Sequence, residues 1–176
     1  FFDFIFSNQV LEHVQDLNSV AAEISRLTKA GGEGLHIFPP RWHWREAHLQ
    51  MPGIHWLPKG FARRWLIYGY TACGIESRWS SMANQPVGKR AETYYRYSIE
   101  RTFYRPNSVI SELFREAGLD TTFRTIDNPK LERFQLVRWA RQNSIPRSWL
   151  NAALMTFVSA ELTTHKVTSN NDADNQ

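Results

Sequence analysis

The sequence is poor in cysteine and lacks a long apolar run. Its 176 residues contain one cysteine, Cys73, which excludes an internal disulfide framework and fits a reducing, cytoplasmic compartment. We expect Cys73 to behave as a small buried hydrophobic residue. The longest uncharged stretch near the C-terminus, residues 148–160, is too short to cross a bilayer, so no membrane span is expected.

The composition is that of a globular chain with unevenly distributed charge. Hydrophobic residues make up 42% of the sequence and charged residues 22%, which is not typical of a disordered chain. The formal net charge is +4, and residues 41–79 hold six basic and two acidic residues together with five of the seven tryptophans. A basic aromatic segment suits nucleic acid, a membrane surface or an anionic small molecule. It also suits a helical insertion with a solvated charged face.

The N-terminal part of the chain predicts one β-α-β unit. Residues 2–7 form a near-continuous apolar run, which favours a parallel strand buried on both faces. Asp16 or Asn18 can cap the helix that follows, and residues 31–32, Gly-Gly, suit a left-handed helix exit. Residues 35–38 form the next strand, which two prolines end.

Residues 41–104 predict an insertion of short helices and loops. Residues 61–70 are amphipathic and predict a helix, whereas residues 94–104 suit an extended return. Four tryptophans of the insertion either line a substrate slot or, as is more frequent, form its core: Trp42, Trp44, Trp56 and Trp65. Beyond the insertion, the pattern predicts helices at 106–117, 128–142 and 148–153, and strands at 119–126 and 154–167.

Two motifs resemble class I S-adenosylmethionine-dependent methyltransferases. Residues 2–14, FDFIFSNQVLEHV, resemble the strand 4 signature of that family, and residues 23–32, EISRLTKAGG, are similar to its run into strand 5. Ala30 stands where proline is usual. Residues 36–60 are similar to a bacterial subgroup, and residues 114–118 match the helix before strand 6.

The resemblance implies an α/β fold, with part of a Rossmann-like methyltransferase sheet. Residues 1–167 would form its C-terminal half, with strands 4, 5, 6 and 7 and a helical lid, residues 41–104, between strands 5 and 6. Residues 168–176 are polar and are predicted to be a disordered tail.

The implied cofactor is S-adenosyl-L-methionine. In the family, a glycine-rich loop after strand 1 and an acidic residue after strand 2 hold this cofactor, and neither motif occurs after Phe1. We therefore expect the sequence to be a fragment, which alone would bind the cofactor weakly and be inactive. The coding sequence ahead of Phe1 is expected to encode both motifs.

By the resemblance, Ser7, Asn8 and Gln9 approach the methionine part of the cofactor. These residues end a predicted parallel strand, and ligands of open α/β sheets bind outside the carboxyl ends of strands. The alternative is a plain strand exit whose polar side chains cap the backbone.

Three further residues are candidates for catalysis on the acceptor side. His48, with Glu46 as its partner, is predicted to act as a base or hydrogen-bond anchor, and His13 either joins them or caps a helix. Glu46 alternatively forms a structural ion pair with Arg41 or Arg45. The spacing of the histidines around Glu46 does not match a helical zinc motif, so no metal is expected.

The function predicted from these features is methyl transfer to a small-molecule acceptor, with an anionic or sugar-like acceptor favoured by the basic insertion. One alternative is another Rossmann-like enzyme, although a dehydrogenase-type Tyr-x-x-x-Lys pair is absent after the second strand. Another is a non-catalytic module that binds an anionic partner. Nucleic acid is not the expected partner, because neither base-stacking strands nor a long basic helix is predicted.

Overall fold

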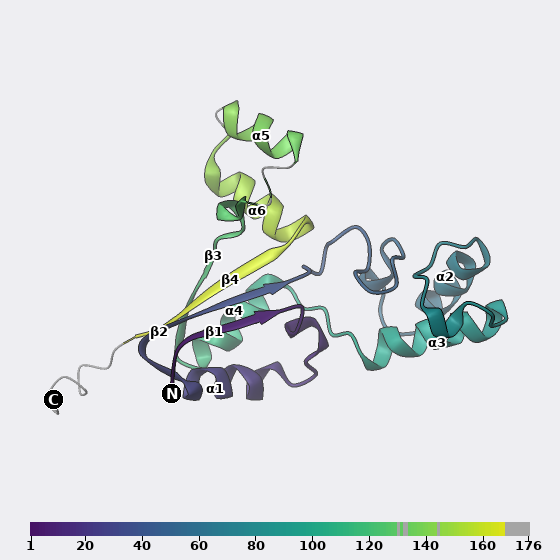
Figure 1. The fold of residues 1–176 in the computed structure, drawn as a ribbon, viewed down its shortest axis with the longest axis horizontal. Helices are drawn as coiled ribbons and strands as arrows, with labels where there is room; N and C mark the ends of the chain where they lie inside the picture. The colour runs from purple at the N-terminus through teal and green to yellow at the C-terminus, as the bar shows by residue number, and fades with distance from the viewer. Residues whose placement is uncertain (130, 132–133, 144, 168–176) are drawn as a thin grey trace, which may run out of the picture.

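The computed structural model describes residues 1–129, 131, 134–143 and 145–167 (Figure 1). A four-stranded sheet has the order β1-β2-β4-β3. Its strands are β1 (Phe2–Asn8), β2 (Thr28–Phe38), β3 (Leu119–Phe123) and β4 (Ala160–Lys166). β1 and β2 are parallel, and β4 runs antiparallel to both β2 and β3. The mixed α/β fold is confirmed, and the strands that were predicted as 4, 5, 7 and 6 lie side by side in that order.

The β-α-β unit forms as predicted, except at its glycines. Helix α1 (Leu17–Leu27) begins after Asp16, whose carboxylate accepts a hydrogen bond of 3.2 Å from the backbone N–H of Ser19. The helix ends at Leu27, and Gly31 lies inside β2 with a φ of 75°. The pairing register of β2 on β1 shifts at this point. Gly31 and Gly32 therefore serve the strand irregularity and not the helix exit, because only glycine adopts such a φ readily.

Helices α1 and α4 (Asn107–Glu116) lie on the same side of the sheet in Figure 1. The main core lies beneath them and includes Leu17, Phe38, Phe114 and Leu162.

Phe2, Phe4 and Phe6 are 53–56% exposed, so the prediction that this strand is buried on both faces is wrong. Alternate residues of a strand share one face, and no described residue covers the face that these rings occupy.

The insertion contains more helix than the sequence predicted. Helices α2 (Phe61–Ala72) and α3 (Val87–Glu100) pack together around Ile67 and Tyr94, and form a helical lobe, residues 61–100, beside the sheet (Figure 1). The predicted extended return at 94–104 is wrong as far as Glu100. Ala91, Tyr94 and Ser98 repeat at helical spacing on the buried face of α3, which explains why this segment is a helix. Short 3₁₀ turns lie at η1 (Leu11–His13), η2 (Ile54–Trp56), η3 (Ser80–Met82) and η4 (Thr125–Asp127).

Exposure corrects two further predictions about side chains. Trp42, Trp44, Trp56 and Trp65 are between 42% and 58% exposed, so they do not form the core of the insertion. Cys73, predicted to be buried, is exposed at the C-terminal end of α2.

The C-terminal boundaries differ from the prediction. Helix α5 (Gln135–Gln142) begins later than the predicted residue 128, and α6 (Arg147–Phe157) extends beyond the predicted 148–153. The last strand begins at Ala160 and not at 154, because residues 154–157 continue α6. The predicted tail, residues 168–176, lies outside the described residues. Within the described part of the chain, every helix is too short or too polar to cross a bilayer.

Gly34 allows the central strands to pack closely, and its substitution should destabilise the fold. A Cβ at this position would overlap Thr164 Oγ1 and lie 3.3 Å from the carbonyl oxygen of Ile5. We expect Gly34→Ala to lower the free energy of unfolding by about 1–3 kcal/mol in denaturant titrations. Gly69→Ala is the matched control. Nothing lies within 4 Å of a Cβ at that position of α2, so it should gain about 0.5–1 kcal/mol. Equal effects of the two substitutions would contradict this account.

Candidate functional site

The parallel pairing of β1 and β2 brings the segments that follow them to one edge of the sheet. Asn8 pairs with Ile37, so both strands end at the same level. Residues 9–14 follow β1, and residues 39–55 follow β2. Ligand sites of α/β proteins occur at this edge.

The predicted cofactor residues lie at the end of β1. The Ser7 hydroxyl is hydrogen-bonded at 2.8 Å to Nδ1 of His36 on the neighbouring strand. Asn8 is the last residue of β1, and both Asn8 and Gln9 are exposed. Gln9 has a φ of 55°, a conformation that costs about 1 kcal/mol for a residue with a side chain. Its N–H donates to the carbonyl of Ile37, so the strained turn is held against β2. Asn8 and Gln9 are therefore accessible to a ligand, whereas Ser7 is engaged with His36.

The structure brings His13 and His48 together. Their ring centroids are 4.6 Å apart, although the residues lie in different segments. His48 Nε2 lies 3.9 Å from Oε1 of Glu12, a residue that the sequence analysis did not select. His13 Nδ1 is 2.6 Å from the carbonyl oxygen of Arg101, so it donates there and leaves Nε2 free. We call Glu12, His13 and His48 the histidine cluster.

Glu46 lies beside the cluster, and its carboxylate is hydrogen-bonded to backbone groups and to a tyrosine. One of its oxygens accepts hydrogen bonds from the backbone N–H groups of His48 and Leu49. The other accepts a hydrogen bond of 2.7 Å from the hydroxyl of Tyr104. Glu46 is 1% exposed. It therefore fixes the turn that carries His48, whereas the carboxylate that faces the imidazole of His48 is that of Glu12. An ion pair of Glu46 with Arg41 or Arg45 does not form.

Burial controls the charges of the histidine cluster. It raises the pKa of Glu12, and the negative charge of Glu46 raises it further. Burial also lowers the pKa of His48, against the opposite effect of Glu46. The cluster thus combines a carboxylate that resists ionisation with a largely neutral imidazole. The role of His48 as a base stays a prediction.

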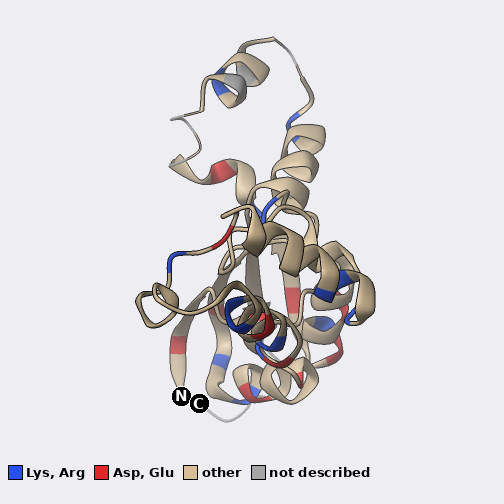
Figure 2. Cartoon of the chain, turned by 90° about the vertical axis from the view of Figure 1, so that its right-hand side faces the viewer, with Lys and Arg blue, Asp and Glu red and all other residues tan. Residues whose placement is uncertain are grey.

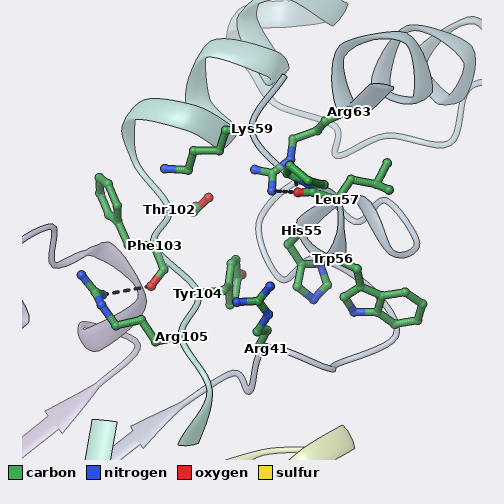
Figure 3. Close-up of a pocket in the computed structure, with 11 residues that line it drawn as sticks. Arg41, His55, Trp56, Leu57, Lys59, Arg63, Thr102, Phe103, Tyr104 and Arg105 are labelled. Atoms are coloured by element: carbon green, nitrogen blue, oxygen red, sulfur yellow. Dashed lines mark hydrogen bonds between the residues drawn. The ribbon is translucent and has the colours of Figure 1, made fainter. Parts of the chain in front are cut away.

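A cavity of about 430 Å³ lies next to the cluster (Figure 3). Figure 3 shows basic side chains that reach it from separate segments, with His55 between Trp56 and Tyr104. The basic residues that line it are Arg41, Lys59, Arg63 and Arg105. Among the described residues that line the cavity, none is acidic. The cavity is therefore suited to an anion.

The basic groups of the cavity differ in how they are engaged. Arg63 donates to the carbonyls of Leu57 and Ser98, and Arg105 donates to those of Val14 and Gln15. These two side chains hold loops in place. Arg41 differs, because its Nε is buried and no described residue accepts a hydrogen bond from it.

Burial first, and neighbouring positive charges second, lower the pKa of two other groups of the cavity. Burial lowers the pKa of Lys59, and the charges of Arg63 and Arg105 lower it further. Burial likewise lowers the pKa of His55 to about 4, and neither ring nitrogen has a hydrogen-bond partner among the described residues. A bound anion would relieve this repulsion and accept from the unpaired donors.

The cavity and the histidine cluster share one segment, residues 102–105. Tyr104 lines the cavity and donates to Glu46. Phe103 also lines the cavity, and its backbone N–H donates to the carbonyl of Glu12 at 2.7 Å. Residues 102–105 therefore connect the cationic cavity to the histidine cluster and to Glu46.

The helical lobe, by contrast, carries both signs of charge, as Figure 2 shows for the helices that face the viewer. Arg64 pairs with Glu92 at 2.8 Å, and Arg90 pairs with Glu76 at 3.0 Å. Some basic residues of the lobe thus have acidic partners there, whereas the basic residues that line the cavity have no acidic residue among its described lining.

Sequence reasoning missed Glu12, Tyr104 and the four cavity cations as a group. Glu12 was visible as the residue before His13, and its position in the segment that follows a predicted strand was the available signal. Tyr104 gave no local signal, because its partner Glu46 is distant in the sequence.

Residues 1–35 match the family model described as "Methyltransferase domain". Over these residues, the match confirms the resemblance to class I S-adenosylmethionine-dependent methyltransferases. No curated protein matches the chain at a significant level.

Two similar solved structures are of phosphoethanolamine N-methyltransferase 2 from Haemonchus contortus. One is in complex with S-adenosyl-L-methionine, and the other with phosphomonomethylethanolamine and S-adenosylhomocysteine. Each is 12% identical to this chain, with a TM-score of 0.40 and coverage of 96% of this chain. The chain spans 34% of the length of these structures, and a likeness of this size does not bear on its substrate.

His36, which holds Ser7, should make the stability depend on pH. Burial lowers the pKa of His36 to about 4, below the value of about 6.5 expected in the unfolded chain. The unfolded state therefore binds more protons between these values, and stability falls as the pH drops from 6.5 to 4. The contribution of His36 is on the order of 3 kcal/mol.

The variant His36→Gln keeps a polar partner for Ser7 but does not titrate. Its free energy of unfolding should fall less steeply over this pH range than that of the natural protein, as measured by denaturant titration at several pH values. Identical pH profiles of the two proteins would show that His36 does not carry the effect.

Proposed function

We propose that this chain supplies the acceptor side of an S-adenosyl-L-methionine-dependent methyltransferase whose acceptor is a small molecule with an anionic group. The observation that carries the proposal is the position of the histidine cluster and the cationic cavity. Two residues of the cluster, Glu12 and His13, follow β1 within the residues that match a methyltransferase domain, and the cavity is linked to the cluster through residues 102–105.

The cofactor is proposed to approach the end of β1. Asn8 and Gln9 are exposed there, and the hydrogen bond from the Gln9 N–H to the carbonyl of Ile37 holds the turn. Methyl transfer from a sulfonium is an in-line displacement, which depends mainly on holding the two reactants in line. A rigid turn for the cofactor and a separate cavity for the acceptor meet that requirement.

The acceptor is proposed to place its anionic group in the cavity and its reacting atom toward the histidine cluster. Arg41 contributes a buried donor that no described residue satisfies, and the neutral imidazole of His55 contributes one unpaired N–H donor. A phosphate, sulfate or carboxylate group would accept from these groups. In this arrangement, Glu46 is a positioning residue, since it fixes the turn of His48 and the Tyr104 hydroxyl.

The proposal is tested by methyl transfer with the full-length natural protein. The assay measures S-adenosylhomocysteine formed with paired acceptors that differ only in an anionic group. We expect turnover with the anionic member of a pair. Arg41→Gln should raise KM for that acceptor by about 10-fold or more, because a charge-assisted hydrogen bond is lost, and should leave kcat nearly unchanged.

Arg64→Gln is the matched control, because Arg64 is exposed on α2, outside the cavity, and pairs with Glu92. It should leave KM unchanged. Absence of any S-adenosylmethionine binding or turnover by the full-length protein would refute the proposed activity. Preference for the uncharged acceptor, with activity intact, would refute only the assignment of the cavity.

A further inference from the structure

Glu12 is a buried carboxylate that lacks a hydrogen-bonding partner. Its side chain is 1% exposed, and neither of its oxygens accepts a hydrogen bond from a described residue. None of the described Lys or Arg side chains forms an ion pair with it. Its nearest partner is Nε2 of His48, at 3.9 Å, which is too long for a hydrogen bond. An unpaired buried carboxylate is costly to a fold, because buried charges are normally paired. The site therefore lacks the positive charge that would compensate Glu12.

The two histidines are arranged as ligands. His13 donates through Nδ1 to the carbonyl of Arg101, which fixes the tautomer that has a lone pair on Nε2. Metal-binding histidines commonly make such a hydrogen bond through their second nitrogen. The Nε2 atom of His48 is buried and has no hydrogen-bond partner among the described residues.

The geometry brings one ligand atom from each of Glu12, His13 and His48 within 4.8 Å of the others. The turn that carries His48 is held by the carboxylate of Glu46 on two backbone N–H groups, and Glu12 and His13 lie in the 3₁₀ turn η1. The ligand set is thus supported by hydrogen bonds of the backbone on both sides. Glu46 also places a second carboxylate beside the cluster, on the backbone N–H groups of the turn that carries His48.

We propose that Glu12, His13 and His48 bind one divalent transition-metal ion, for which Zn²⁺ is the best suited. Two imidazole nitrogens and one carboxylate oxygen are a ligand set that catalytic zinc sites use, with a further position left open. His13 and His48 are partly exposed, so the open position would face solvent or a bound molecule. This assignment replaces the expectation, drawn from sequence spacing, that the chain binds no metal.

The position of the ion suggests its use, and this step rests on the proposed function. An ion at the ends of β1 and β2 would contact the reacting oxygen or nitrogen of the acceptor. It would favour the deprotonated form of a hydroxyl, as metals do for bound water. His48 would then act as a ligand and not as the base.

The metal site is tested with the full-length natural protein after treatment with a chelator, in the absence of S-adenosylmethionine and acceptor. Calorimetry with Zn²⁺ should give one ion per chain, and Zn²⁺ should raise Tm. Co²⁺ should give the absorption bands of a site with nitrogen ligands. Glu12→Gln and His48→Asn should each weaken Zn²⁺ binding by about 100-fold or more, since each removes a ligand.

Glu12→Gln also provides the folding control. It replaces an unpaired buried carboxylate with a neutral group of the same shape, so the metal-free variant should be as stable as the natural protein or more so. His165→Ala removes an exposed histidine of β4, distant from the cluster in the sheet, and should leave Zn²⁺ binding unchanged.

Two results would overturn the metal site. One is the absence of Zn²⁺ binding by the natural protein, and the other is equal binding by the natural protein and Glu12→Gln. Because neither measurement involves methyl transfer, failure of the metal site and failure of the proposed activity are distinguishable.

Discussion

The parallel pairing of β1 with β2 is the constraint on which the candidate site depends. The two strands end at the same level, so the segments that follow them face each other across the sheet edge. Glu12 and His13 come from one segment and His48 from the other. A change of register by one residue would turn alternate side chains to the opposite face and separate these groups. Gly34 lets β4 pack closely against the other side of β2, because a Cβ there would overlap Thr164.

A second level of organisation comes from buried polar contacts between loops. Glu46 ties the turn after β2 to Tyr104, and the N–H of Phe103 ties the same strip of chain to Glu12. Such contacts are stronger in a buried setting than in water, and they fix positions that loops otherwise leave free. They explain why the cluster and the cavity lie next to each other although the sequence separates their residues widely.

The sequence predicted the elements that local signals define. The cap at Asp16, the prolines after Phe38 and the apolar stripe of α4 each gave a boundary within a few residues. Residues 94–100 were misassigned because aromatic residues also favour strands, and their helical form depends on packing against α2. The burial of β1 was misjudged because it depends on what covers the sheet, which no local pattern encodes. Glu12 was missed for the same reason. What distinguishes it is a buried carboxylate without a hydrogen-bond partner, and burial depends on the tertiary structure.

The charges on the two sides of residues 102–105 give the site a direction. The cavity on one side gathers basic groups, and burial together with the charges of Arg63 and Arg105 lowers the pKa of Lys59 there. The cluster on the other side holds Glu12 beside Glu46. In the proposed function, the anionic group of the acceptor would be attracted to the cavity and not to the carboxylates of the metal-free cluster, which would favour one orientation. A divalent ion in the cluster would add a positive charge on that side. The orientation of the acceptor would then depend on how the two places bind it. The cavity would offer several hydrogen-bond donors to its anionic group, whereas the metal ion would accept one lone pair from its reacting atom.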